Sequence, residues 1–384
     1  MKKLKVLSIS HSCVVAEYQK RMEEVGKYRD VDLTVLVPKR WFQFNKRVDL
    51  EKDWDSRYRI VSRQPITWGL KKGGLQNVTH IHPGIGRLLK GIGPDIIELW
   101  EEPFSMVTAH TIFWGKRVTP SAKIIFFSAQ NVFKKYPYPF SVFEKYAYKT
   151  ADQAFLMSRT VSEVLKEKGY GKQFAILPLG VDPETFRKKE VCYLRRRLGI
   201  RDFVVGFVGK ITSQKGILDL IEAVGQINKS IQLLIVGNGD LKGEVERRAR
   251  SLGLGQRTII IGAVPHSEVP DYLNCMDLLA LPSVTLPSLK EQFGRILIEG
   301  MACEVPVLGS DSGEIPATIG KAGLIFNQGD VKDLREKIEG LVENRTLRGL
   351  LAKNGRKRVL EHFTWKAIAE KQYRVYRELM GEVT

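Results

Sequence analysis

The sequence predicts an α/β protein made of two doubly wound, Rossmann-like parallel-sheet domains that face a cleft. Three observations predict this fold. The 384 residues, 43% hydrophobic and 27% charged, suffice for two ordinary domains and are too apolar for a disordered chain. Short apolar runs alternate with segments of helical spacing, which is the pattern of βα units around a parallel sheet. Both periodicities break in LPLGVDPETF at 177–186, so we expect a hinge there.

The apolar runs predict the strands of both sheets. In the first half they are 4–10, 31–37, 95–99, 123–128, 153–157 and 174–179. In the second half they are 203–209, 231–236, 258–261, 278–281, 305–309 and 323–326. Three helical patterns follow, near 330–343, 346–361 and 364–381. The first domain is therefore expected at 1–180 and the second at 181–365, with function in the loops at the carboxyl ends of the strands.

Charge and cysteine usage exclude several classes of protein. The formal net charge is +18, and residues 1–185 hold 30 of the 61 basic residues against 19 of the 43 acidic ones. The four cysteines show no C-x-x-C spacing, which argues against a structural zinc site and a disulfide framework and favours a reducing cytosol. No run approaches the roughly 18 apolar residues of a membrane-spanning helix, so any membrane contact should be peripheral.

The loop EQFGRILIE at 291–299 offers the richest chemistry. Two glutamates, Glu291 and Glu299, flank a helix that is expected to open at Gly294. Amides at a helix N-terminus, with the guanidinium of Arg295, suit a diphosphate. The carboxylates could accept hydrogen bonds from sugar and ribose hydroxyls about 12 Å apart. The alternative is an ordinary amphipathic helix with solvated glutamates.

Two further loops follow strands of the second domain. GKITSQKG at 209–216 brings Lys210 and Lys215 to a strand end, where they could neutralise the charge on a departing diphosphate. Its spacing does not match the phosphate loop of P-loop NTPases. In VGNGD, Gly237 and Gly239 would let the backbone approach a ligand closely. The alternatives are loop lysines of a basic protein and a plain tight turn.

Taken in this order, the three loops resemble the family 4 glycosyltransferases, which are retaining enzymes of the GT-B fold that use a nucleotide sugar. The resemblance extends over nearly the whole chain, from the opening βα unit through the linker LPLGVDPETF to FTWKAIAEKQYRVY. Its most specific part is EQFGRILIEGMACEVPVLGSDSGEIP at 291–316. The resemblance implies a first domain on the acceptor side and a second domain that binds the donor. It also implies that residues 366–384 cross back to the first domain.

The resemblance also implies roles for single residues. It places Glu299 on the ribose hydroxyls, Glu291 near the donor sugar, and the backbone of Phe293, Gly294 and Arg295 on the diphosphate and donor. Lys215 matches the phosphate-binding lysine of the family. Lys210 stands where an arginine is usual, which keeps the charge but loses the bidentate fork. In the acidic loop, Gln292 replaces the first glycine of the usual E-G-F-G.

The first domain departs from the family at Gln130, where many relatives carry a histidine. Glutamine can hydrogen-bond a sugar hydroxyl but cannot act as a general base. A front-face reaction does not need that base, because the departing phosphate oxygen removes the acceptor's proton. A double displacement would need a carboxylate, for which Glu101 and Glu102 are candidates by elimination; such a pair more often caps a loop or binds acceptor. Contacts to donor or acceptor are expected from His11, Ser12, Glu102, Gln130 and Asn131.

No metal is expected. Asp30-x-Asp32 and Asp53-x-Asp55 resemble the D-x-D metal motif, but this pattern often arises by chance. The remaining histidines show no ligand spacing and are expected to be structural: His80, His82, His110, His266 and His362.

The expected function is therefore a retaining glycosyltransferase that moves a hexose or related sugar from a UDP- or GDP-linked donor to a lipid-linked, polysaccharide or small-molecule acceptor, with no cofactor. PKRWFQFNKR at 38–47 and KKYPYPF at 134–140 interleave cations with aromatics, which suits an anionic membrane surface or nucleic acid. Lipid-linked acceptors among relatives favour a cytoplasmic protein at the inner membrane face. Two other hypotheses stay open, a catalytically inactive nucleotide-sugar-binding module and a nucleic-acid-binding protein.

Overall fold

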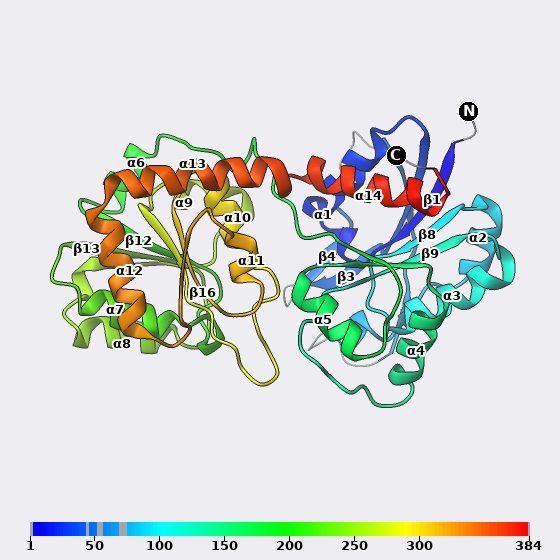
Figure 1. Ribbon diagram of the computed structural model, residues 1–384, viewed down its shortest axis with the longest axis horizontal. Coiled ribbons are helices and arrows are strands. Elements are labelled where there is room, and N and C mark those ends of the chain that lie inside the picture. Colours follow the sequence, from blue (N-terminus) through cyan, green and yellow to red (C-terminus); the bar gives the residue numbers. More distant parts are fainter. Residues whose placement is uncertain (1–2, 44–45, 52–56, 69–74, 383–384) are drawn as a thin grey trace. The chain divides into compact units, whose positions relative to one another are not determined.

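The computed structural model describes residues 3–43, 46–51, 57–68 and 75–382. The chain forms two compact units (Figure 1). Unit 1 comprises Met1–Pro178 and Trp365–Thr384, and unit 2 comprises Leu179–Thr364. Both the first and the last described segments of the chain therefore belong to unit 1.

Unit 1 is built on a seven-stranded parallel sheet in the order β11-β10-β9-β8-β1-β2-β5. The order reverses between β1 and β8, because β1 pairs with β2 on one side and with β8 on the other. The strands are β1 (Leu4–Ile9), β2 (Val31–Val37), β5 (Arg59–Ser62), β8 (Ile96–Leu99), β9 (Lys123–Ser128), β10 (Gln153–Leu156) and β11 (Phe174–Ile176).

Helices cover both faces of this sheet, as a buried parallel sheet requires. On β1, Val6 belongs to one apolar core while Leu7 and Ile9 belong to the other, because alternate side chains of a strand point to opposite faces. One core includes α1 (Ala16–Gly26) and α14 (Trp365–Leu379). The other includes α2 (Ile85–Ile92), α3 (Met106–Val118), α4 (Phe140–Thr150) and α5 (Arg159–Glu167).

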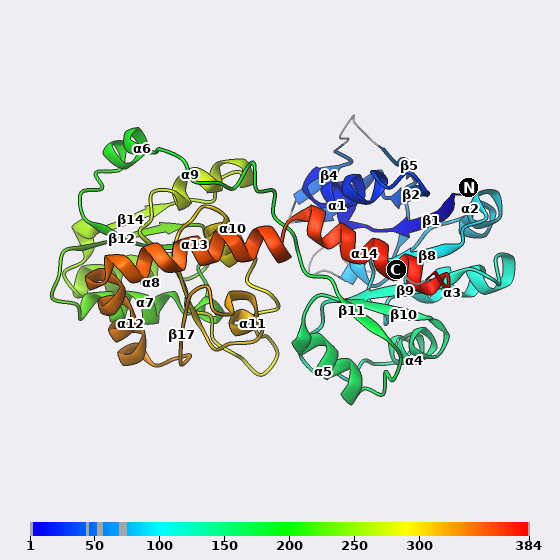
Figure 2. The same ribbon diagram turned by 45° about the horizontal axis from the view of Figure 1, so that its top comes forward.

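The closing helix α14 is anchored on a buried carboxyl group of β8. Glu98 accepts hydrogen bonds from Tyr376 Oη at 2.5 Å and from Gln372 Nε2 at 2.9 Å. The guanidinium of Arg21 lies 3.9 Å from Glu98 and 3.1 Å from the centroid of the Trp100 ring. Burial raises the pKa of Glu98. Figures 1 and 2 show α14 beside α1, and the two helices are in contact, which confirms the predicted return of the C-terminal helix.

Unit 2 carries a six-stranded parallel sheet in the order β14-β13-β12-β15-β16-β17. Its strands are β12 (Phe203–Val208), β13 (Ile231–Val236), β14 (Thr258–Ile261), β15 (Leu278–Leu281), β16 (Val307–Ser310) and β17 (Leu324–Phe326). Its helices are α6 (Cys192–Arg197), α7 (Ile217–Gly225), α8 (Lys242–Ser251), α9 (Val269–Leu273), α10 (Arg295–Ala302), α11 (Ile315–Ile319), α12 (Val331–Glu343) and α13 (Arg345–His362). The order reverses between β12 and β15.

The predicted fold class is confirmed, since every expected strand is present. The sequence did not predict β5 or two small antiparallel pairs of unit 1, β3 (Arg40–Gln43) with β4 (Lys46–Asp49), and β6 (Ile66–Thr67) with β7 (His80–Ile81). These strands have two to four residues, and β3, β5 and β6 are partly exposed, so they lack a clear apolar run. Over the described residues, no helix is both long enough and apolar enough to span a membrane.

Candidate functional site

The strand order of unit 2 reverses between β12 and β15, so the carboxyl ends of these two strands form a topological switch point. The loop after β12 leads to one side of the sheet and the loop after β15 to the other, and ligands of open α/β sheets bind at such a switch point. Lys210 and Lys215 lie in the first of these loops, and Glu291 and Gly294 lie in the second. The sequence-predicted residues of unit 2 thus fall at its switch point.

Lys215 and Glu291 form an ion pair across this switch point. Lys215 Nζ lies 2.6 Å from Glu291 Oε2, which also accepts a hydrogen bond from Ser283 Oγ at 2.8 Å. Ser283 is fully buried and Glu291 is 9% exposed, so the carboxylate is firmly held. Lys210 has an exposed side chain. The pair joins two loops that approach the sheet from opposite sides.

Helix α10 begins at the position that the sequence predicted. Gly294 precedes it with φ +77°, a left-handed conformation that favours glycine, and a Cβ atom there would lie 2.9 Å from Leu297 Cδ1. Phe293 is buried and packs against the ring of Phe363 at 5.7 Å between centroids. The first-turn amides of α10 give its N-terminus a partial positive charge.

Glu299 lies one turn into α10 and is 4% exposed. Its Oε1 lies 2.8 Å from Arg295 Nε and 2.8 Å from His266 Nε2. Arg295, expected at a diphosphate, therefore holds the Glu299 carboxylate in this structure. His266, expected from the sequence to be structural, belongs to this cluster. Its only signal was its place shortly after β14, at the same sheet edge.

The glycines after β13 make room for the neighbouring loop. A Cβ atom on Gly237 would lie 1.9 Å from the carbonyl oxygen of Gly209, and one on Gly239 would lie 2.1 Å from that of Ile211. The Ile211 amide also donates to the Asn238 carbonyl at 3.0 Å. The close approach expected at these glycines is thus made, in this structure, by the backbone of the lysine loop, which they fix in place.

In unit 1, His11 and Glu101 meet at the corresponding switch point, after β1 and β8. The His11 amide donates to Glu101 Oε1 at 2.8 Å, and His11 Nδ1 lies 2.8 and 2.7 Å from the two carboxylate oxygens. Burial alone would raise the pKa of Glu101, but the contacts with His11 and the nearby His80 lower it. Ser12 Oγ lies 2.9 Å from Ser10 Oγ.

Glu102 fixes the loop that follows β9. Its carboxylate accepts hydrogen bonds from Ser128 Oγ at 2.7 Å and from the Ala129 amide at 2.9 Å. Burial raises the pKa of Glu102 to about 7. Gln130 Nε2 donates to Tyr136 Oη at 3.3 Å, and Asn131 is buried beside it. This arrangement favours the loop-capping interpretation of Glu102 over that of a nucleophile.

Among the described residues, one group of three side chains could hold a metal ion. His11, His80 and Glu101 place their ligand atoms within 4.8 Å of one another, although they stand far apart in the sequence. Of the D-x-D candidates, Asp30 pairs with Arg377 at 3.0 Å. Asp53 and Asp55 lie outside the described residues.

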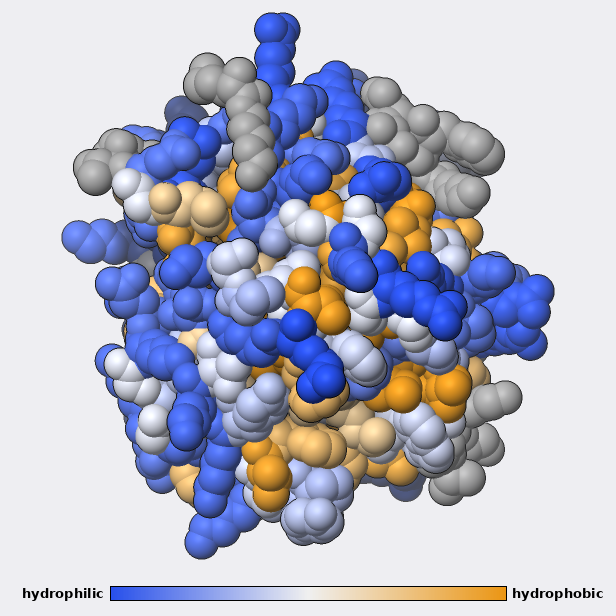
Figure 3. Space-filling view, turned by 90° about the vertical axis from the view of Figure 1, so that its right-hand side faces the viewer, coloured by the Kyte–Doolittle hydropathy of each residue, from blue (hydrophilic) through white to orange (hydrophobic). Residues whose placement is uncertain are grey.

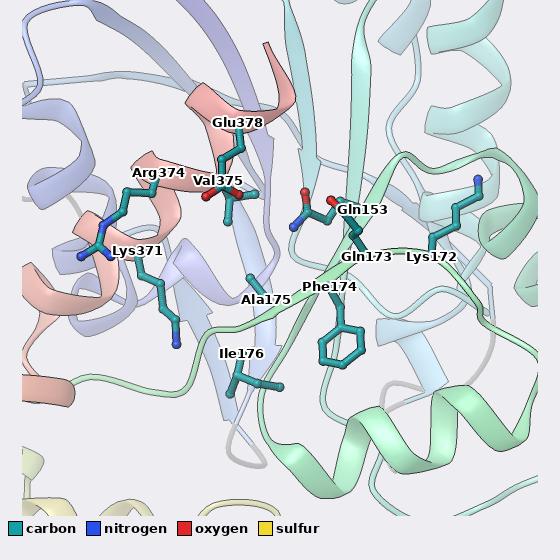
Figure 4. Close-up of a pocket in the computed structure, with 10 residues that line it drawn as sticks. All are labelled: Gln153, Lys172, Gln173, Phe174, Ala175, Ile176, Lys371, Arg374, Val375 and Glu378. Atoms are coloured by element: carbon teal, nitrogen blue, oxygen red, sulfur yellow. The ribbon is translucent and has the colours of Figure 1, made fainter. Parts of the chain in front are cut away.

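A cavity of about 620 Å³ lies between β11 and α14 of unit 1. Figure 4 shows Lys371 and Arg374 extending from α14 on one side and Phe174 from β11 on the other. Burial, with Arg374 and Arg159, lowers the pKa of Lys371. This cavity follows the edge strand of the sheet rather than its switch point, and the sequence did not predict it.

Comparison with known proteins shows which family the second unit resembles. Residues 194–358, all within unit 2, match the family described as glycosyl transferases group 1. The capsular polysaccharide biosynthesis glycosyltransferase CapM of Staphylococcus aureus is 31% identical over 186 residues, which is 47% of each chain. The chain spans about half the length of the curated relatives it matches.

Solved structures share the whole fold. A glycosyltransferase from Rickettsia africae aligns over 100% of both chains with a TM-score of 0.73 and 17% identity. HepE of Anabaena, in complex with UDP and glucose, aligns over 98% of this chain and 100% of that one with a TM-score of 0.68 and 17% identity. Unit 2 is therefore similar to the group 1 glycosyl transferases, and the chain has the GT-B fold.

Proposed function

We propose that this protein is a group 1 glycosyl transferase, a retaining enzyme that moves a hexose or related sugar from a UDP- or GDP-linked donor to a lipid-linked, polysaccharide or small-molecule acceptor. The observation that carries the proposal is the Lys215–Glu291 pair beside the N-terminus of α10, at the switch point of unit 2. The family match over the same unit supports it. So do the UDP of the Anabaena structure and the polysaccharide named for the staphylococcal relative.

The diphosphate of the donor binds at the N-terminus of α10 in this proposal, with backbone amides from Phe293 to Arg295 as donors. Lys215 Nζ then exchanges its contact with Glu291 for one with a phosphate oxygen. Together with Lys210, it neutralises the charge that grows on the leaving diphosphate. Glu291 becomes available to hydroxyls of the donor sugar.

Glu299 binds the ribose hydroxyls at the other end of the donor. A carboxylate is suited to this role because it only accepts hydrogen bonds, and two ribose hydroxyls can donate to it. His266 and Arg295 hold it in one orientation, since each lies 2.8 Å from Oε1. Gly237 and Gly239 contribute indirectly, through the position of the lysine loop.

Unit 1 carries the acceptor side. Contacts to the acceptor or to the donor come from its loop residues His11, Ser12, Glu102, Gln130 and Asn131. The bond from the sugar carbon to the diphosphate oxygen breaks, and the bond to the acceptor oxygen forms on the same face. The acceptor's proton passes to the departing phosphate oxygen. This step needs no general base, so Gln130 serves as a hydrogen-bonding group, and the proposed step uses no cofactor.

We also propose that the protein is cytoplasmic and contacts an anionic membrane through unit 1. Tyr138 is 83% exposed and Lys135 is exposed beside it, which suits an interfacial aromatic with a neighbouring cation. In 38–47, by contrast, Trp41 is buried, and residues 44 and 45 lie outside the described residues. Figure 3 shows a mainly hydrophilic face with several hydrophobic groups. Pelleting with vesicles of anionic but not neutral lipid, lost in Tyr138→Ser, tests the contact.

Thermal unfolding with UDP, GDP, ADP or CDP tests the donor site. A nucleotide at 100 times its dissociation constant adds about 2.7 kcal/mol of stability, which for a unit of this size is roughly 5–11 °C. Lys215→Ala should abolish the shift. Lys229→Ala is the matched control, because Lys229 pairs with Glu343 on the same unit, outside the proposed site.

Each outcome separates the proposal from its alternatives. A selective shift, followed by release of the same nucleoside diphosphate when sugar donor and acceptor are present, supports it. Binding without turnover for every acceptor indicates an inactive nucleotide-sugar-binding module. The absence of any nucleotide shift contradicts the proposal, and strongly salt-dependent binding of DNA or RNA would then favour the nucleic-acid hypothesis.

A further inference from the structure

We propose that His11, His80 and Glu101 of unit 1 bind a divalent transition metal, and that Zn²⁺ is the ion that fits them. The inference goes beyond the proposed transfer reaction and departs from the sequence-based expectation of no metal. Two imidazoles and one carboxylate are a donor set that Zn²⁺ takes in proteins. Three protein ligands would leave a fourth position for water or another oxygen ligand.

The distances between the ligand atoms fit such a site. Around a tetrahedral Zn²⁺ with bonds of about 2.0–2.1 Å, the ligand atoms lie about 3.3 Å apart. His11 Nδ1 lies 2.7 Å from Glu101 Oε2, and His80 Nε2 lies 3.9 Å from Glu101 Oε1. All three ligand atoms lie within 4.8 Å of one another. Each separation therefore has to change by no more than about 1.5 Å to hold the ion.

His80 supplies the independent observation that points to a ligand. Its side chain is fully buried, and Nε2 has no hydrogen-bond partner among the described residues. Nδ1 lies 3.0 Å from the Gln76 carbonyl, which can only accept, so Nδ1 carries the proton and Nε2 presents a lone pair. This lone pair faces the Glu101 carboxylate, whose Oε1 lies 3.9 Å away and cannot donate a hydrogen bond to it.

The surroundings match those of a metal site. Metal-binding histidines commonly donate their other ring N–H to a backbone carbonyl, which fixes the ring, and His80 does so to Gln76. Glu101 is oriented by the His11 amide at 2.8 Å. Trp41 borders both rings, with centroids 5.2 Å from His11 and 4.9 Å from His80. The side chain of His11 is 18% exposed, against 0% and 1% for the other two, so the fourth position would open near His11.

Cobalt titration of the full, untagged chain tests the site. The protein is treated with EDTA, desalted, and titrated with Co²⁺, whose visible absorption is intense only in a tetrahedral or five-coordinate site. We expect one equivalent to bind with such a spectrum and Zn²⁺ to displace it. Glu101→Gln and His80→Ala should weaken binding by roughly 100-fold or more, since loss of even an outer-shell partner costs 10–100-fold.

The controls keep the result interpretable. His110→Ala, on α3 of the same unit, removes a histidine outside the group and should leave one equivalent bound. Glu101→Gln preserves the size of the side chain and guards against a folding defect in His80→Ala. The proposal is overturned if the native chain gives only a weak octahedral spectrum, or if Glu101→Gln binds Co²⁺ as the native chain does. Neither result depends on the nucleotide shift of unit 2, so the two proposals fail separately.

Discussion

Two tyrosines of α14 allow the anchoring of the C-terminal helix to be measured. Tyr376 donates to Glu98 at 2.5 Å and Tyr373 donates to Asp30 at 2.6 Å. Tyr376 and Glu98 are fully buried, whereas the Asp30 side chain is 32% exposed. The two hydrogen bonds are alike in chemistry and length and differ in burial, and Tyr376 Oη also accepts a hydrogen bond from Gln372 Nε2 at 2.6 Å.

Tyr376→Phe should cost about 1.5–3 kcal/mol, because it removes a hydrogen bond from a buried carboxyl group that water cannot replace. Tyr373→Phe should cost no more than about 1 kcal/mol, since water can hydrate Asp30. The ring at position 373 remains stacked on Tyr28 in this variant, since the two ring centroids lie 3.9 Å apart. For a unit of this size, the Tm should fall by about 3–12 °C in Tyr376→Phe and by at most about 4 °C in Tyr373→Phe.

Urea unfolding followed by tryptophan fluorescence is the assay. All 6 tryptophans of the chain belong to unit 1, so their emission reports this unit alone even when the whole chain does not unfold in one step. The midpoint should fall without a change in m-value. The reasoning is refuted if the free energies of unfolding of the two variants differ by less than about 0.5 kcal/mol, because burial would then have no measurable effect on the two hydrogen bonds.

Three further predictions follow from the geometry of the two units. The pKa of Glu102 is raised to about 7 from 4.5, so the folded state binds the carboxyl proton more tightly than the unfolded state does. The protonated carboxyl group should therefore contribute its full stability to unit 1 below about pH 4.5. This contribution should fall by up to about 3 kcal/mol as the pH rises to 7. Urea unfolding at each pH checks this, and Glu102→Gln should remove the slope. Gly237→Ala should weaken nucleotide binding at least tenfold in calorimetry by displacing the lysine loop, whereas Gly243→Ala, with nothing within 4 Å of its Cβ, should not. Glu299→Gln should reduce nucleoside diphosphate affinity about tenfold, the value of one charge-assisted hydrogen bond, while Glu336→Gln on the exposed face of α12 leaves it unchanged.

The sequence predicted the two sheets well because their strands are nearly continuous apolar runs. VDLTVLV at 31–37 became β2 with the expected ends, and IQLLIV at 231–236 became β13. Arg59–Ser62 was missed, because RIVS is short and only partly buried. Its pairing with β2 is a tertiary contact that local pattern does not encode.

The candidate site of unit 2 was predicted through its loops, but the contacts within it were not. The loop residues lie at the switch point, whereas the pairing of Lys215 with Glu291 joins positions 76 residues apart. His266 carried no motif, and its contact with Glu299 joins positions 33 residues apart. Glu98 was hidden within the apolar run IIEL, because its partners Gln372 and Tyr376 come from the last helix.

The return of α14 to unit 1 sets an order for folding during synthesis. Unit 2 is one continuous segment, Leu179–Thr364, whereas unit 1 needs residues that leave the ribosome after all of unit 2. Until Trp365–Leu379 emerges, the face of the first sheet that Tyr376 and Val375 cover lacks its last helix and exposes apolar surface. Unit 2 can therefore complete its core first. Until α14 emerges, the incomplete first unit is an aggregation-prone folding intermediate.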